Sequence, residues 1–119
     1  MAAAKKKRAA PRAPLLSHNV YVVELAHEVL LDRRFRKRNL GYLEDKPCVY
    51  VGMTGLAVAD RYKNHKRGHK GNVFVLRFGT RLLPELFAHL NPMPYEAALT
   101  MERELAEELR EAGYGVWQA

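Results

Sequence analysis

Three side chains close together in the sequence are suited to phosphodiester chemistry. Tyr50 ends a short run of β-branched and aromatic residues, and a turn at Gly52 and Gly55 leads to Arg61 and His65. In a helix the i, i+4 spacing of Arg61 and His65 places both side chains on one face. A phenol, a guanidinium and an imidazole that converge beside lysines would form such a site if a carboxylate elsewhere completed it.

Glu102 is the candidate carboxylate because of its place in a predicted helix from Pro94 to Ala112. Pro94 is placed to start this helix and Gly113 to end it. A carboxylate is rarely buried unless it is paired or binds a metal. Glu102 lies within the apolar stripe of the helix, which is formed by Tyr95, Ala98, Leu99, Leu105, Ala106, Leu109 and Ala112. Glu102 therefore either holds a metal ion or pairs with an arginine, for which Arg61 is a candidate.

Glu104 is the alternative acid in the same helix. Its neighbours three and four residues later are Glu107 and Glu108, whereas those of Glu102 are apolar. The helical period therefore favours Glu102 as the buried carboxylate.

Taken together, these motifs resemble the GIY-YIG nuclease family of homing, restriction and repair endonucleases. Five motifs match in order: Asn19-Val20-Tyr21, Tyr50-Val51-Gly52, the pair Arg61 and His65, then Glu102, and last Gln118. Asn19 departs from the glycine that opens the first motif, and the connector at about 26–46 is longer than in minimal members. The resemblance spans about residues 18–118.

The resemblance implies a metal-dependent DNA endonuclease with one Mg²⁺ or Mn²⁺ on Glu102. Tyr50 would act as general base or position the attacking water, and Arg61 would stabilise charge on the scissile phosphate. His65 would orient Tyr50 or share its proton. The fifth residue of the expected catalytic set is Tyr21.

Gly52 and Gln118 are expected to support this set. An unperturbed phenol has a pKa of about 10 and is a poor base at neutral pH. The implied mechanism therefore requires cations near Tyr50 that favour phenolate.

Basic residues are gathered in three segments of the chain, which has a net charge of +7. Residues 1–14 carry five of these charges and have nothing to bury, so we expect a disordered basic arm. The connector patch consists of Arg33, Arg34, Arg36, Lys37 and Arg38. The third segment, the 63–70 patch, consists of Lys63, Lys66, Arg67 and Lys70. The three segments predict a surface that binds a nucleic-acid backbone, and DNA is the expected partner.

One small domain is expected at 15–119. Strands are predicted at about 18–25 and 48–52, and helices at about 28–36, 57–67 and 94–112. Residues 72–78 have strand-forming side chains but caps at Asn72 and Gly79, and the family has a helix there, which we follow. The apolar pattern of 82–90 is helical, yet the family places the third strand at about 85–89, which we also follow. With 114–118 returning over the sheet, the predicted fold is α/β, a small three-stranded, mostly antiparallel sheet flanked by helices.

The sequence lacks the features expected of membrane-spanning and secreted proteins. No apolar run reaches the length of a membrane span and no secretory segment follows the first lysines, so we expect a cytoplasmic protein, nucleoid-associated if bacterial. Cys48 is expected in the core. Two alternatives to a nuclease stay open: a non-catalytic nucleic-acid-binding module, and an interaction protein whose basic arm binds RNA or an acidic partner. The sequence does not indicate an oligomeric state.

Overall fold

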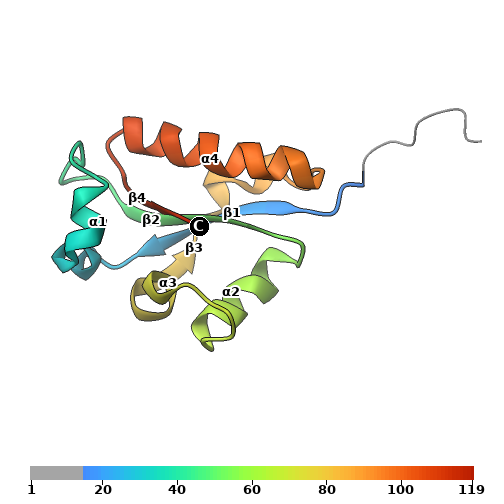
Figure 1. Cartoon of the computed structure of the whole chain (residues 1–119), viewed down its shortest axis with the longest axis horizontal. Coiled ribbons are helices and arrows are strands. Elements are labelled where there is room, and N and C mark those ends of the chain that lie inside the picture. The colour runs from blue at the N-terminus through green and yellow to red at the C-terminus, as the bar shows by residue number, and fades with distance from the viewer. Residues whose placement is uncertain (1–14) are drawn as a thin grey trace, which may run out of the picture.

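The structure, a computed structural model that describes residues 15–119, has a four-stranded sheet between two layers of helices (Figure 1). The expected arm at 1–14 lies outside the described residues. The strands are β1 (Asn19–Leu25), β2 (Cys48–Thr54), β3 (Gly79–Leu82) and β4 (Gly115–Gln118). The α-helices are α1 (Arg33–Lys37), α2 (Val58–Lys66), α3 (Val73–Phe78) and α4 (Tyr95–Glu111), and the 3₁₀ turns are η2 (His27–Leu31), η3 (Pro84–Leu86) and η4 (Ala88–Leu90).

The sheet has the order β3-β1-β2-β4 and is mixed. β1 pairs antiparallel with β2 and with β3, whereas β4 pairs parallel with β2. The α/β class is confirmed, but the expectation of three strands is wrong by one. Gly113, with φ of 98°, reverses the chain after α4, and the strand formers Val116 and Trp117 then extend beside β2.

The third strand in the chain lies earlier than expected. β3 occupies Gly79–Leu82, and the expected strand at 85–89 is instead part of η3 and η4. Pro84 starts the 3₁₀ turn η3. The helical apolar period of 82–90 therefore predicted this region better than the family resemblance did. β3 is held on β1 by the ion pair between Arg81 and Glu24, 3.2 Å from Nε to Oε1.

Residues 72–78 fold as the expected helix. The Asn72 side chain accepts the backbone N–H of Phe74 at 2.8 Å, and Gly79 ends the helix. This cap satisfies a backbone donor that the short helix cannot satisfy itself. The cap residues therefore outweigh the strand propensity of the apolar residues.

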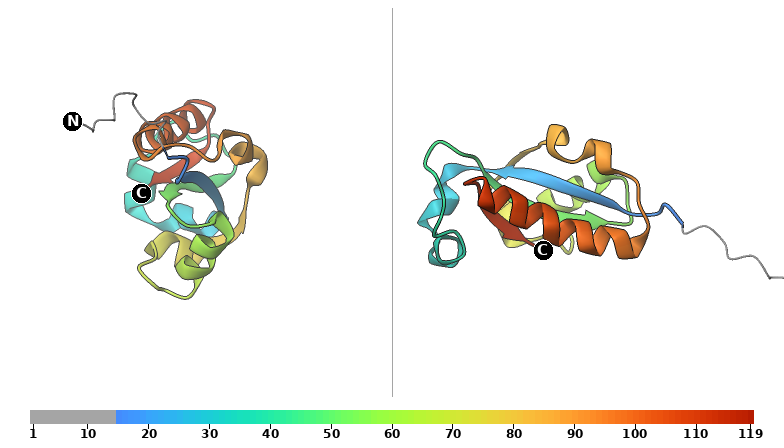
Figure 2. Two further views of the ribbon diagram at one scale, coloured as in Figure 1. Left: turned by 90° about the vertical axis from the view of Figure 1, so that its right-hand side faces the viewer. Right: turned by 90° about the horizontal axis from the view of Figure 1, so that it is seen from above.

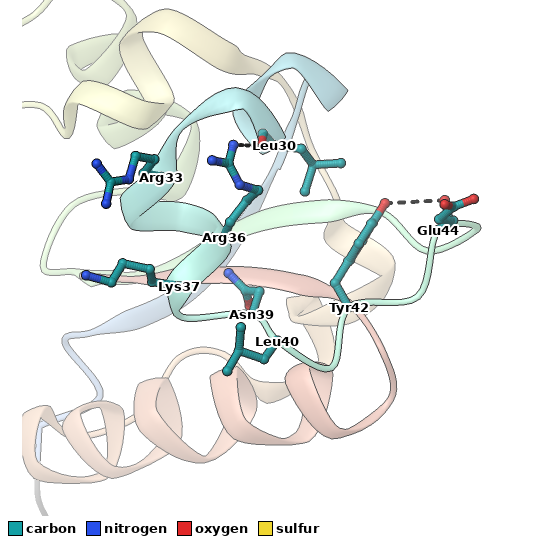
Figure 3. Close-up of a pocket in the computed structure, with 8 residues that line it drawn as sticks. All are labelled: Leu30, Arg33, Arg36, Lys37, Asn39, Leu40, Tyr42 and Glu44. Carbon is teal, nitrogen blue, oxygen red and sulfur yellow. Dashed lines mark hydrogen bonds between the residues drawn. The ribbon is translucent and has the colours of Figure 1, made fainter.

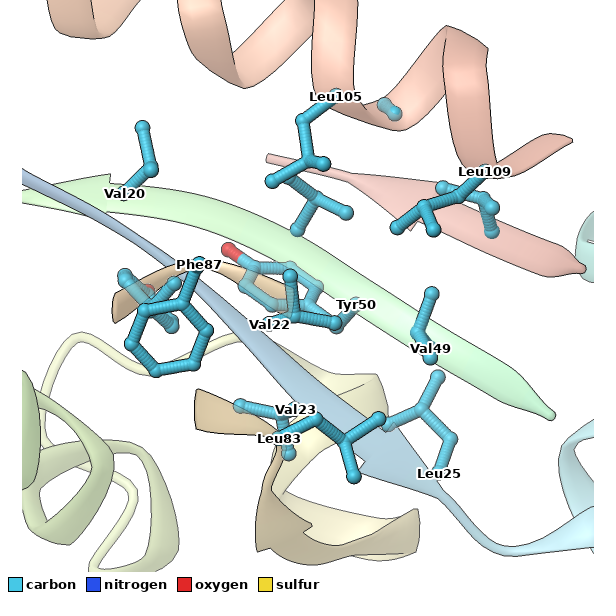
Figure 4. Close-up of a cluster of buried hydrophobic side chains, with 14 of the residues drawn as sticks. Val20, Val22, Val23, Leu25, Val49, Tyr50, Leu83, Phe87, Leu105 and Leu109 are labelled. Carbon is cyan, nitrogen blue, oxygen red and sulfur yellow. The ribbon is translucent and has the colours of Figure 1, made fainter. Parts of the chain in front are cut away.

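α4 covers one face of the sheet, while α2 and α3 cover the other (Figures 1 and 2). Leu105 and Leu109 of α4 point at the strand valines in the core (Figure 4). The buried stripe is narrower than predicted, because Tyr95 and Leu99 are exposed. Cys48 is buried as expected. Within residues 15–119 no helix is both long and apolar enough to cross a membrane.

The connector between β1 and β2 is folded onto the end of the sheet. Buried Asn39 accepts the Val116 N–H at 2.8 Å and donates to the carbonyls of Phe35, at 2.7 Å, and Val116, at 3.1 Å. Arg110 of α4 donates to the same Asn39 oxygen at 3.3 Å. One side chain thus satisfies the free edge of β4 and ties the connector to it.

Candidate active site

Tyr21 and Tyr50 lie side by side on the sheet face that α2 and α3 cover. Tyr21 is the register partner of Gly52, and Tyr50 that of Val23, so both side chains leave the same face. Their ring centroids are 6.1 Å apart. A Cβ on Gly52 would lie 2.7 Å from Cζ and Oη of Tyr21 and 3.0 Å from Cε1 of Tyr50. Glycine is therefore needed at 52 for the two phenols to approach each other.

His65 holds Tyr21 and not Tyr50. Its Nε2 lies 2.7 Å from the Tyr21 hydroxyl, and its Nδ1 accepts the Asn72 backbone N–H at 2.9 Å. Nδ1 therefore carries no proton in the neutral ring, so Nε2 donates to Tyr21. The hydroxyl proton of Tyr21 is left free to be donated elsewhere. The expectation that His65 orients Tyr50 is therefore corrected to Tyr21, although the Tyr50 ring contacts the imidazole edge-on at 5.4 Å.

The imidazole and the phenols are neutral in this setting. Burial, with a smaller effect of Arg61, lowers the pKa of His65 to about 4. Burial raises the pKa of Tyr50, and the charge on Arg61 offsets only part of that rise. The pKa of Tyr21 is raised by burial in the same way. The expected stabilisation of phenolate by nearby cations is therefore weaker than the cost of burial.

Arg61 lies half-buried on α2, one turn before His65. One of its terminal nitrogens donates to the Lys70 carbonyl at 3.0 Å, which leaves other donors of the planar fork for an anion. Its charge reaches Tyr21, Tyr50 and His65, because it lowers the pKa of all three. The predicted convergence of the phenol, the imidazole and the guanidinium is thus present in the structure.

Glu102 is buried, only 7% exposed, and does not pair with Arg61. The ion pairs among residues 15–119 are Asp32–Arg34 and Glu24–Arg81. Oε1 of Glu102 accepts a hydrogen bond from the Gln118 amide at 3.2 Å. Burial raises the pKa of Glu102, and this hydrogen bond lowers it in part. Glu104 is exposed, so the buried acid of the helix is the one that the period favours.

Glu102 and the tyrosines approach the sheet from opposite faces. Gln118 is the register partner of Val51, whose side chain leaves the face opposite that of Tyr50. The pairing with β4 ends there, so in the described part of the chain β2 continues from Gly52 to Thr54 without a strand beside it on that edge. The Glu102 charge nevertheless raises the pKa of both tyrosines.

The four cations of the 63–70 patch are all exposed. Lys66 donates to the Gly79 carbonyl at 2.8 Å, and Arg67 contacts the Asn64 side chain. The Lys70 carbonyl accepts the hydrogen bond from Arg61. The patch therefore presents positive charge beside the candidate catalytic arginine.

The five exposed cations of the connector patch have different surroundings. Arg34 pairs with Asp32 at 2.9 Å. Arg36 donates a hydrogen bond to the Leu30 carbonyl at 2.7 Å. The side chains of Arg33 and Lys37 leave α1 on the side opposite Leu30 (Figure 3). A cavity of about 660 Å³ opens here, lined by Leu30, Arg33, Arg36, Lys37, Asn39, Leu40, Tyr42 and Glu44. None of the expected catalytic residues lines this cavity, so we do not place the reaction there.

Sequence reasoning missed two residues of the tyrosine face. Trp117 is the register partner of Tyr50, and the pairing of β4 with β2 that brings them together has no local signal in the sequence. Gly71 lies against His65, and a Cβ there would be 2.8 Å from the His65 Cα. In the sequence, the only sign of this contact is that Gly71 directly precedes the cap residue Asn72.

Comparisons of the chain with known protein families, curated proteins and solved structures give no match. The function is therefore inferred from the residues and their geometry.

Proposed function

We propose that the protein is a metal-dependent endonuclease that hydrolyses phosphodiester bonds in DNA. The observation that carries this proposal is the buried carboxylate of Glu102, whose partner is the neutral amide of Gln118 and not a cation. A buried carboxylate without a cation is costly, and a metal ion would remove that cost. The resemblance to the GIY-YIG family supports the same interpretation.

The donors at Glu102 suit a hard divalent cation. Residues 15–119 hold no cluster of three or more His, Cys, Asp or Glu side chains that would make a metal cage. Mg²⁺ does not need one, because it keeps several waters and binds through one or two carboxylates together with substrate phosphate. Glu102 would hold the ion, with Gln118 orienting its carboxylate. When bound, such an ion supplies charge that neutralises the leaving oxygen.

The chain's own side chains divide the remaining work. Arg61 would bind a nonbridging oxygen of the scissile phosphate through its free donors. Tyr21, whose oxygen accepts a hydrogen bond from the His65 N–H, would use its own hydroxyl to donate a hydrogen bond to a phosphate oxygen or to water. Tyr50 would position the attacking water as a neutral phenol, because its raised pKa favours this role over that of a free base.

The test is a cleavage panel with a matched pair of variants. Labelled single-stranded, duplex, flap and junction DNAs are incubated with Mg²⁺, with Mn²⁺ and with EDTA. Glu102→Gln and Glu104→Gln remove the same charge from the same helix, one at a buried and one at an exposed position. We expect metal-dependent cleavage that Glu102→Gln abolishes and Glu104→Gln retains, with DNA binding kept by both.

Three results would contradict the proposal. Binding without cleavage of any substrate would favour a non-catalytic nucleic-acid-binding module. Cleavage that persists in EDTA would exclude the metal. Cleavage by both variants would remove Glu102 from the mechanism.

A further inference from the structure

Trp117 lies directly beside Tyr50 on the face that carries the candidate catalytic cluster. The two residues are register partners in β4 and β2, which are neighbouring strands about 4.8 Å apart. Trp117 is half-buried and is the only tryptophan of the chain. Phe74 of α3 packs against its ring, with the centroids 4.5 Å apart. The indole is thus held in a fixed place next to the proposed water-positioning phenol.

The guanidinium of Arg38 lies over this indole. Its central carbon is 4.3 Å from the ring centroid, close enough for a cation–π contact. Arg38 ends α1 and is exposed, and its neighbour Asn39 is bonded to both backbone groups of Val116. The position of the guanidinium is therefore set by the folded connector and not by a flexible loop.

The contact with the indole leaves Arg38 able to bind an anion. A cation–π contact uses no N–H donor of the guanidinium, so these donors stay available for a ligand. Among the described residues the carboxylates that form ion pairs are those of Asp32 and Glu24, so none neutralises Arg38. Arg110 lies near enough for the charge on Arg38 to affect it. Burial lowers the pKa of Arg110, and the charge on Arg38 lowers this pKa further, by more than the charge on Glu107 raises it. Two arginines near each other favour an anion between or beside them.

We propose that Arg38, held over the Trp117 ring beside Tyr50, is a phosphate clamp that binds a backbone phosphate of the substrate strand adjacent to the scissile one. This inference rests on the proposed nuclease function. The substrate strand then runs from the 63–70 patch, past Arg61 and Tyr50, to the connector. The connector is in this way part of the substrate site.

The single tryptophan provides a direct probe of the clamp. A short DNA strand, and the same sequence as a duplex, are titrated into the full-length protein in EDTA, so that binding is measured without cleavage. Trp117 fluorescence and the salt dependence of affinity are recorded for Arg38→Ala, Arg38→Lys and Arg77→Ala. Arg77→Ala is the matched control, because Arg77 is also exposed and also lies over an aromatic ring, 4.9 Å from the centroid of Phe78, but belongs to neither basic patch of the described residues. Melting temperature checks that each variant folds.

We expect DNA to change the fluorescence of the unmodified protein and of Arg77→Ala, and not that of Arg38→Ala. Arg38→Ala should weaken binding by about tenfold, the effect of losing one charge-assisted hydrogen-bonded contact, and lower the log-log salt slope by about one. Arg38→Lys should restore the salt slope but not the full affinity, since an ammonium lacks the fork.

Equal weakening by Arg38→Ala and Arg77→Ala, with the fluorescence response intact in both, would overturn the clamp. A saturable response to inorganic phosphate or a free mononucleotide that DNA does not compete away would also overturn it, since the site would then bind free phosphate and not a strand. The fluorescence, affinity and salt-slope measurements do not depend on cleavage. If no DNA were cut but the Arg38 variants gave the expected results, the proposed nuclease function would be wrong and Arg38 would still be a nucleic-acid contact.

Discussion

Tyr21 and Tyr50 are adjacent phenols, but only the Tyr21 hydroxyl is hydrogen-bonded to His65, and this difference separates their expected roles. The Tyr21 oxygen accepts a proton from buried His65, so its hydroxyl is structural as well as chemical. No such contact ties the Tyr50 hydroxyl to His65, which meets the Tyr50 ring edge-on. Removing each hydroxyl should therefore have a different effect on stability.

Tyr50→Phe should reduce turnover by about 10²-fold, the usual contribution of a positioned acid–base group, and leave the melting temperature nearly unchanged. Tyr21→Phe should also reduce turnover but destabilise the protein by about 1–3 kcal/mol, because the His65 N–H loses its partner in a buried position. Single-turnover cleavage and chemical denaturation measure the two effects. A fully active Tyr50→Phe would remove that phenol from the mechanism and leave Tyr21 as the candidate.

His65 predicts a pH dependence of stability. Its pKa falls from 6.5 to about 4 on folding, so the unfolded chain takes up a proton at a pH where the folded protein does not. The stabilisation is complete above pH 6.5 and is lost as the pH falls toward about 4. It amounts to up to about 3 kcal/mol over this window.

The measurement is the free energy of unfolding across that window for the unmodified protein and for His65→Gln. The difference between the two should shrink as the pH falls. Glu102 contributes with the opposite sign, because its pKa is raised, but it is common to both proteins and cancels in the difference. A constant difference would show that His65 does not stay neutral in the folded protein.

At the scale of elements, the proposed catalytic face depends on the absence of a side chain at one position of β2, Gly52. Gly52 of β2 lies under the ring of Tyr21, and a Cβ at this position would lie 2.7 Å from Cζ of that ring, which is too close for any side chain. Gly52→Ala must therefore move Tyr21, which is buried and bonded to His65.

Gly52→Ala should cost about 1–3 kcal/mol of stability, the usual cost of overpacking, and reduce cleavage to a similar degree as loss of the tyrosine hydroxyl. Gly41→Ala is the matched control, because nothing lies within 4 Å of the Cβ position at Gly41. Denaturation and cleavage of the two variants are compared. If Gly52→Ala were as stable and active as Gly41→Ala, the close approach of the two phenols would not matter to the site.

At the scale of the whole molecule, positive charge is distributed over separate parts. The arm at 1–14 carries five positive charges, and the connector patch and the 63–70 patch supply nine of the 15 lysines and arginines of residues 15–119. Contacts of this kind with phosphate are independent of sequence and screened by salt.

Deleting residues 2–14 should weaken DNA binding and lower the log-log salt slope by up to about four, a limit reached only if nearly all five charges contact phosphate. Cleavage at saturating DNA and the melting temperature should hardly change, since the composition of this segment, mainly Ala, Lys, Arg and Pro, offers little apolar surface to bury. Binding measured over a salt series tests this. An unchanged slope would make the arm a localisation signal or protein-binding tail instead.

The sequence by itself determined the local elements and the burial of the candidate acid. Gly113 and the helical period placed α4 correctly, because these signals act within one or two turns of a helix. The helix at 72–78 was predicted from the caps at Asn72 and Gly79 only together with the family resemblance, because its side chains favour a strand. The same period separated Glu102 from Glu104. Where the helical pattern of 82–90 was set aside in favour of the family's strand, the prediction failed.

Only the tertiary structure decided which residues meet across the sheet. The parallel pairing of β4 with β2 places Trp117 beside Tyr50 and Gln118 beside Glu102, and the fold around the Asn72 amide directs His65 to Tyr21. These contacts join residues far apart in the chain, and strand register has no signature within a single segment. Long-range pairing is set by the burial of the whole core, so partners of this kind become visible only once the chain is folded.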